Sequence, residues 1–132
     1  MNSLRIWIII SWIALPTVMF GGYSLLRLTA LSKLTPFQRN YFKAGHAHAG
    51  VLLVLSLVTL ILLGGTELSD GVRWLVCLLL LFGVLAQSGG MFVHAFAGRQ
   101  GEWSRGNSLS VAGAGMLAIA LLIVAYGVAI TG

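Results

Sequence analysis

Hydrophobic residues fill four long runs of the chain, and short polar stretches separate these runs. The runs predict helices over about residues 5–28, 41–63, 72–97 and 108–130. A helix of about 20 apolar residues crosses the hydrocarbon core of a bilayer, so each run is long enough to span. Short connections favour antiparallel neighbours. The pattern therefore predicts an all-α fold, an integral membrane four-helix bundle that forms a single domain over residues 1–132.

Composition excludes a soluble protein and changes how the positive charge is interpreted. Of the 132 residues, 58% are hydrophobic and 8% are charged, against about one quarter charged in soluble domains. A net charge of +5 in a soluble chain would suggest nucleic acid. Here the basic residues flank the spans, where they orient the protein and meet anionic lipid. The expected partner is thus the lipid bilayer, and no nucleic acid partner is expected.

The basic residues divide unevenly between the two ends of the predicted bundle. The first and third connections share one end, called the basic end below, which holds Arg27, Lys33, Arg39, Lys43, Arg99 and Arg105. The opposite end holds Arg5 and Arg73. The positive-inside rule places the basic end in the cytoplasm and both termini on the outer side. No small-x-small cleavage site follows the first run, so we expect a retained helix in a multi-pass cell-membrane protein.

All three histidines of the chain are predicted to lie at the basic end. His46 and His48 belong to the first turns of the second run, and His94 comes about one turn before the end of the third. Antiparallel helices bring these positions to similar depth. Residues i and i+2 of a helix point about 200° apart, so only one of His46 and His48 is expected to face His94.

A stripe on the third run identifies its inward face. Cys77, Leu80, Val84, Gln87, Met91 and His94 follow one another at spacings of three and four residues. A glutamine within a span is costly unless it has a partner, so this face is expected to look into the bundle. The pocket is predicted to be lined by Gln87, Met91, Tyr23, Arg27 and Asn107.

Histidines on facing helices suit either haem b or copper. Haem would take one axial histidine from each helix, with Arg39, Lys43 and Arg99 near its propionates. A small ion such as copper or zinc would take His46, His48 and His94 together, with either Met91 as a further ligand for Cu(I) or water in an open position. A single cysteine, Cys77, excludes a Cys-pair metal site.

The segment from His46 to Leu57, which opens His-Ala-His-Ala-Gly, resembles the His-x-His helix starts of membrane proteins related to the haem-copper oxidase catalytic subunits, including the NnrS type. The resemblance implies a haem or copper environment for His46 and His48. Those oxidases use about six histidines, and this chain has three, so at most one simple site is expected. The segment also resembles small uncharacterised bacterial membrane proteins, which implies a bacterial inner membrane.

Three functions remain open at this point. The leading one is electron transfer or redox chemistry on a lipophilic partner such as a quinone. The second is a transporter or channel-like protein whose histidines relay protons, ions or a small substrate. The third is a non-catalytic accessory subunit in a homo-oligomer or a larger membrane complex. Small residues around Ala114 and Ala118 predict a face for close helix contact, within the bundle or between copies.

Overall fold

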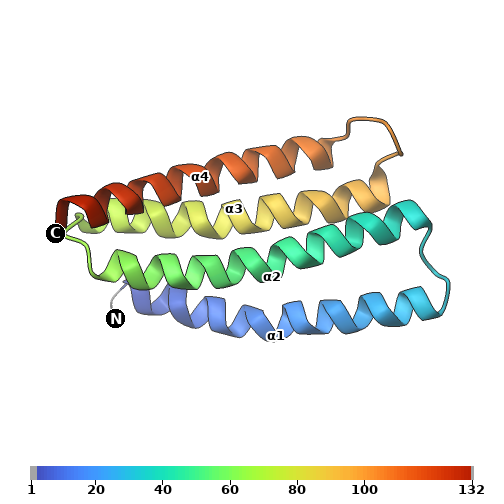
Figure 1. Ribbon diagram of the computed structural model, residues 1–132, viewed down its shortest axis with the longest axis horizontal. Coiled ribbons are helices and arrows are strands. Elements are labelled where there is room, and N and C mark those ends of the chain that lie inside the picture. Colours follow the sequence, from blue (N-terminus) through green and yellow to red (C-terminus); the bar gives the residue numbers. More distant parts are fainter. Residues whose placement is uncertain (1–2, 132) are drawn as a thin grey trace.

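The computed structural model describes residues 3–131 and contains four helices in that range. They are α1 (Ser3–Ala30), α2 (Pro36–Gly64), α3 (Asp70–Ala97) and α4 (Arg105–Thr131). Consecutive helices run antiparallel along one long axis (Figure 1). Each is long and apolar enough to cross a membrane. The predicted all-α membrane bundle is therefore confirmed.

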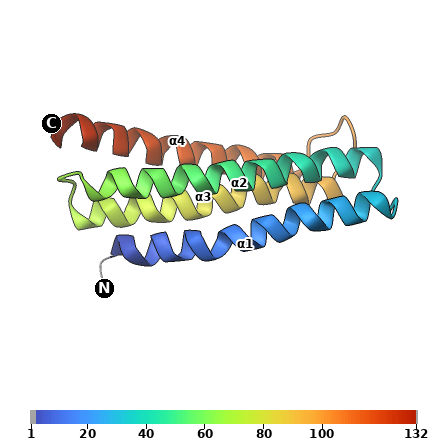
Figure 2. The ribbon, with the colours of Figure 1, turned by 60° about the horizontal axis from the view of Figure 1, so that its bottom comes forward.

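The helices pack unequally. The closest pair is α3 and α4; α2 packs against α3, and α1 packs mainly on α2 and barely touches α3. In Figure 2, α1 lies at the edge of the bundle, away from α4. The main apolar core is formed mostly by α2, α3 and α4, with Leu4 as the buried contribution of α1, and it includes Leu60, Leu63, Val76 and Ala120. This asymmetry leaves α1 with one well-packed neighbour.

The second helix begins at Pro36, about five residues before its predicted start at residue 41. Thr35 forms a capping box: its Oγ1 accepts from the Gln38 N–H at 3.2 Å, and the Gln38 Oε1 accepts from the Thr35 N–H at 3.1 Å. Proline fits the first helical turn because the missing N–H would have no partner there. Cap chemistry, not hydrophobicity, therefore sets this boundary.

We expect Thr35→Ala to lower the free energy of unfolding by about 1 kcal/mol, because the cap bond to the Gln38 N–H is lost. Ser69→Ala is the matched control, since Ser69 is the N-cap of α3 and its side chain makes no cap hydrogen bond. Denaturant titration of both variants in mixed micelles measures the difference. If both variants lost the same amount of unfolding free energy, the capping box would not stabilise the start of α2.

Glycines bring the backbones of α3 and α4 into direct contact. Gly83 and Gly90 on α3 face Gly113 and Gly106 on α4, and each pair is seven residues apart. A Cβ added at Gly83 would lie 2.7 Å from Leu117 Cγ, and one at Gly106 would lie 2.6 Å from the backbone N of His94. Small residues that let two helix backbones approach closely are typical of helix packing in membranes. They fix the position of His94 relative to the start of α4.

The small residues singled out from the sequence occupy a different face. Ala114 and Ala118 are exposed, and a Cβ on Gly115 would meet nothing within 4 Å. Gly113 and Leu117 are buried against α3 instead. Within one chain, α4 therefore contacts α3 through the face that carries Gly106 and Gly113, and Ala114 and Ala118 point outward.

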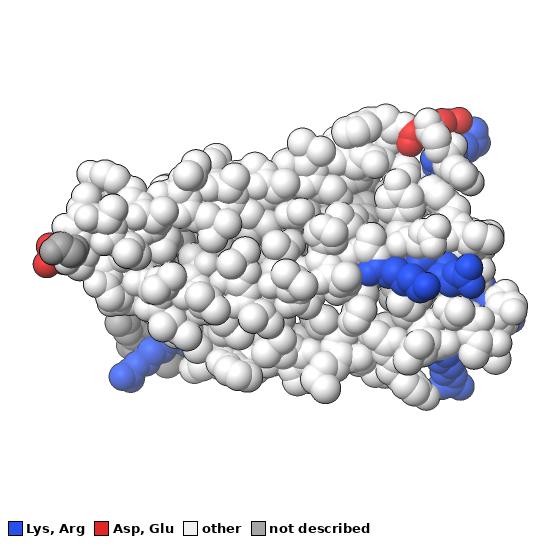
Figure 3. Space-filling view, in the orientation of Figure 1, with Lys and Arg blue, Asp and Glu red and all other residues white. Residues whose placement is uncertain are grey.

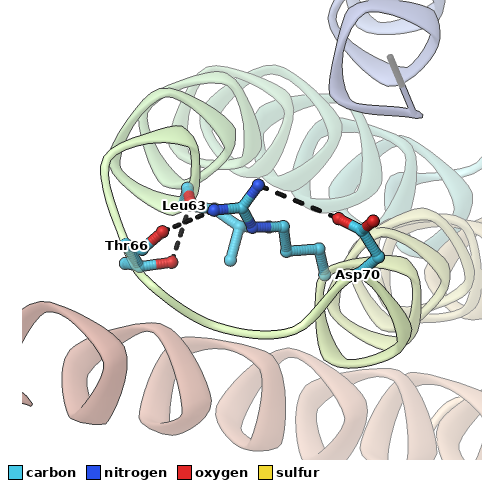
Figure 4. A network of polar contacts seen from close by, with 4 residues as sticks. Leu63, Thr66 and Asp70 are labelled. Carbon is cyan, nitrogen blue, oxygen red and sulfur yellow. Dashed lines mark hydrogen bonds and ion pairs between the residues drawn. The ribbon is translucent and has the colours of Figure 1, made fainter.

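Arg73 links residues on both sides of the turn between α2 and α3, and Figure 4 shows how Leu63, Thr66 and Asp70 lie in this network of polar contacts. Its Nη2 donates to the backbone oxygen of Thr66, whose hydroxyl donates to the Leu63 oxygen at 2.8 Å. Arg73 Nη1 lies 4.0 Å from a carboxylate oxygen of the exposed Asp70, an ion pair that contributes little in water. The end of α4 joins this turn, since the Glu67 N–H donates to Thr131 Oγ1 at 3.1 Å.

Charged side chains lie at the two ends of the molecule. The space-filling view in Figure 3 shows an uncharged surface over most of the length of the helices, with Lys and Arg gathered toward the end that carries the α1–α2 and α3–α4 connections. The structure therefore has the basic end expected from the sequence. The side of the membrane on which this end lies remains a prediction of the positive-inside rule.

Candidate functional site

His94 is the most deeply buried polar side chain at the basic end, with 2% of its surface exposed. Aromatic rings of α2 cover it: the Tyr41 centroid lies 4.4 Å from the imidazole centroid and the Phe37 centroid 5.3 Å from it, both edge-on. Phe37 and Tyr41 are one helical turn apart and share a face. The early start of α2 thus builds part of this site, because Phe37 belongs to its first turn.

Ser104 fixes the orientation and the tautomer of the His94 ring. Its Oγ lies 2.6 Å from His94 Nδ1, donates to Asn107 Oδ1 at 3.1 Å and accepts from the Gly106 N–H at 3.1 Å. Asn107 Oδ1 also accepts from the Ser104 N–H, which identifies it as the oxygen. A hydroxyl has one proton, so His94 Nδ1 carries the proton of its own bond. His94 Nε2 is left with a free lone pair.

A hollow of about 230 Å³ adjoins His94 between α2, α3 and α4. Two of the predicted residues, Met91 and Asn107, line it together with His94. The rest of the lining is Tyr41, Gly90, Trp103, Ser110 and Val111. Met91 and His94 stand at i and i+3 on α3 and therefore present a thioether and an imidazole on one face.

His46 belongs to a different helix interface. Its ring lies against Gly21 and Gly22 of α1: a Cβ at Gly22 would be 2.9 Å from His46 Nε2, and one at Gly21 would be 3.6 Å from Nδ1. No hydrogen bond joins the ring to any residue in the range 4–131. The glycine pair accommodates the imidazole between α1 and α2, so His46 faces away from His94.

His48 contacts the backbone of its own helix. Its Nδ1 lies 2.9 Å from the Ala44 carbonyl oxygen, and because a carbonyl only accepts, Nδ1 must carry the proton. His48 lies seven residues after Tyr41, so the two share a face of α2. Of the His46/His48 pair, His48 is on the side of α2 that faces His94.

The structure does not gather the three histidines around one centre. Within the part of the chain described, no group of three or more His, Cys, Asp or Glu side chains could hold a metal ion. Lys43 and Arg99 are exposed at the basic end, and Arg39 is half-buried there with a buried Nε that has no hydrogen-bond partner. Their guanidinium and ammonium groups remain available to an anionic group at this end.

The other predicted pocket residues lie elsewhere. Tyr23 and Arg27 are on the exposed side of α1 and do not line the hollow. Gln87 is half-buried on α3, and its backbone oxygen accepts from Ser110 Oγ at 2.9 Å. The stripe that contains Gln87 does face inward as expected, because Cys77, Leu80 and His94 are buried.

Sequence reasoning missed the roles of Tyr41 and Ser104, which hold His94 more directly than any predicted partner does. The signal was present in both cases. Phe37 and Tyr41 form an aromatic i, i+4 pair, and Ser104 precedes the fourth run with Asn107 three residues later, as in an N-cap. Both residues lie in stretches that hydrophobicity alone assigns to loops or span ends.

Comparison with known proteins adds no further assignment: no protein-family model, curated protein or solved structure matches the chain.

Proposed function

We propose that the protein holds a single copper ion at the basic end and exchanges electrons with a lipophilic partner in the bilayer. The proposal is carried by two observations: His94 and Met91 line one hollow, and the bond from His94 Nδ1 to Ser104 leaves the imidazole Nε2 as the ring nitrogen free to bind a metal. Soft thioether ligands select Cu(I), and imidazole suits copper in either oxidation state. The donor set therefore fits Cu(I) better than Zn²⁺, which prefers four ligands drawn from N, S and carboxylate oxygen.

The surroundings of His94 have the features of a metal-binding histidine. Such residues usually donate their second ring N–H to a fixed acceptor, which sets the tautomer and the ring orientation. Ser104 does this for His94, and Asn107 and the Gly106 N–H hold Ser104 in turn. Phe37 and Tyr41 keep water from the ring. A pre-oriented ligand loses little conformational freedom on binding.

Size favours copper over haem b. The hollow of about 230 Å³ is smaller than the roughly 300–1,000 Å³ of pockets that hold drug-sized ligands. It accommodates an ion with one further small ligand, such as water. Haem would also need a second axial group, and His48, the other candidate on this side of α2, does not line the hollow. Binding a copper ion therefore requires a smaller structural change around the hollow than binding haem b does.

Within this proposal, each residue has a definite task. Copper supplies one-electron chemistry when bound. His94 and Met91 bind the ion, Ser104 orients the imidazole, and the rings of Phe37 and Tyr41 limit access of water. The apolar surface of the bundle gives the site access to partners dissolved in lipid. A quinone is the expected class of partner, because it accepts and donates single electrons within the bilayer.

Metal analysis and chelator competition test the proposal. We expect the purified chain to bind about one Cu(I) per molecule, and we expect Met91→Leu and His94→Gln to weaken binding at least about tenfold. Met19→Leu is the control, since Met19 is exposed on α1 and far from the hollow in sequence. A Soret band in protein from its native host would show haem instead. Equal copper affinity in all four proteins would remove the basis of the copper proposal.

A further inference from the structure

Arg39 differs from the other basic residues of the basic end, because packing holds its guanidinium in place. Its Nε is enclosed and unpaired, whereas its two Nη groups are not enclosed and form no hydrogen bond or ion pair within residues 4–131. A guanidinium binds phosphate or carboxylate through two parallel N–H bonds, and the Nη pair offers such a fork here. Arg39 is half-buried, and the exposed basic residues of this end are Arg27, Lys33, Lys43, Arg99 and Arg105.

The last turns of α1 account for the enclosure of Arg39. Helices α1 and α2 lie side by side (Figure 1), and His46 of α2 lies against Gly22 of α1. Seven residues, or two helical turns, further along each helix toward their connection, the same antiparallel register leads to Arg39 and Thr29. Arg39 therefore lies at the edge between α1 and α2, with its Nη groups open to an outside partner.

Lys43 provides a second positive charge on the same face of α2. It follows Arg39 by four residues, so the two side chains are neighbours on the helix surface. No Lys, Arg, Asp or Glu follows Lys43 before α2 ends at Gly64, so the two cations mark the boundary of the apolar span, where lipid headgroups lie. Two like charges one turn apart repel each other, and an anion between them would remove that repulsion.

The chain supplies no carboxylate to these two cations. Its acidic residues are Glu67 and Asp70 in the turn at the opposite end and Glu102 in the α3–α4 connection. Within the part of the chain that the structure describes, the one ion pair joins Arg73 to Asp70. The anion that completes the Arg39 and Lys43 pair must therefore come from outside the chain.

An exposed apolar stripe continues from Lys43 along the span. Its members follow one another at spacings of three and four residues and are all exposed: Ala47, Val51, Val54, Val58 and Ile61. The 14 residues from Ala47 to Ile61 cover about 21 Å, more than the roughly 15 Å of hydrocarbon in one leaflet. Figure 3 shows the same change of character, with positive side chains at the basic end and uncharged surface beside them. One acyl chain fits along this stripe.

We propose that Arg39 and Lys43 bind the phosphate of one anionic phospholipid, of the phosphatidylglycerol class, whose acyl chain lies along the stripe below Lys43. The Nη groups of Arg39 donate two hydrogen bonds to the phosphate, and the Lys43 ammonium donates a third. A choline headgroup would bring its own cation toward these two, so the site selects an anionic lipid over a zwitterionic one. The site does not depend on copper, since neither residue lines the hollow beside His94.

Native mass spectrometry of the full chain in an uncharged detergent tests the proposal by titration with dioctanoyl phosphatidylglycerol. We expect one tightly bound lipid per chain, and we expect dioctanoyl phosphatidylcholine to bind at least about fivefold more weakly. Arg39→Gln and Lys43→Gln should each raise the Kd of phosphatidylglycerol about three- to tenfold. Arg105→Gln is the control, with an increase of less than about twofold, since it removes one exposed charge at the same end but on α4, which lies away from α1 (Figure 2).

Soluble competitors identify the source of the phosphate. Inorganic phosphate and glycerophosphoglycerol, which has the headgroup without acyl chains, should not displace the lipid at equal concentration. Displacement by either would make this a site for free phosphate compounds and overturn the proposal. Equal affinity for the two lipids, or the same increase of Kd in all three variants, would show charge attraction without a defined site and would also overturn it. Lys43→Gln and the comparison of the two lipids decide the question if Arg39→Gln does not fold.

Discussion

Replacing Gly113 by alanine is expected to lower the free energy of unfolding by at least about 2 kcal/mol, whereas Gly115→Ala changes it by less than about 0.5 kcal/mol. A Cβ on Gly113 would collide with the backbone N of Gln87 and would lie 2.7 Å from the Gly83 oxygen. Backbone atoms cannot rotate away, so α3 and α4 must separate. A Cβ on Gly115 meets nothing within 4 Å.

The comparison is well matched because both residues lie in the middle of the same helix, two positions apart. Any change in helix propensity is common to the two variants. Unfolding of each variant in mixed micelles with increasing dodecyl sulfate gives the two free energies. Separation of α3 from α4 would also disturb the Ser110–Gln87 bond. Similar stability of the two variants would show that α4 packs through another face.

The sequence predicts the class of fold well because membrane spans are set by length and hydropathy alone. All four runs appear as helices, and α3 ends at Ala97 as predicted. The boundaries that shift are those decided by polar side chains. Thr35 and Gln38 extend α2 backward through residues that a hydropathy pattern treats as loop.

It is harder to predict which side chains of a helix point into the bundle, and α4 shows why. This helix is apolar around its whole circumference, so periodicity does not separate an inner from an outer face. Gly113 and Ala114 are neighbours with similar hydropathy, and only the first is buried. Which face of α4 is buried depends on the residues of α3 that pack opposite it, namely Gly83 and Gly90. The sequence of α4 alone does not show this pairing of helices.

The histidines show the same limit. Helix geometry correctly separates His46 from His48 by about 200°, but the direction of each depends on the neighbours of α2. Gly21 and Gly22 form the surface against which His46 packs. The sequence shows that these glycines permit close approach by a neighbour, but it does not identify the neighbour. His48 is thereby placed on the side of α2 that carries Tyr41.

His94→Ala is expected to lower the stability of the metal-free bundle by about 3 kcal/mol, and His48→Ala by less than about 1 kcal/mol. The first variant removes a buried ring from contact with Phe37 and Tyr41 and enlarges the hollow that the ring already borders. It also deprives Ser104 of a partner at the start of α4. His48 is half-buried and bonds only to the Ala44 oxygen of its own helix.

The measurement uses unfolding in mixed micelles with a copper chelator present, because a bound ion would add its own stabilisation to the folded state. Under these conditions the difference between the variants reports packing and hydrogen bonding alone. A loss of about 3 kcal/mol in His94→Ala would mean that His94 joins α2, α3 and the start of α4 even without an ion. His94→Gln, which can still reach Ser104, should recover part of that stability without recovering copper affinity. Recovery of both, or of neither, would contradict a histidine that both supports the bundle and binds metal through Nε2.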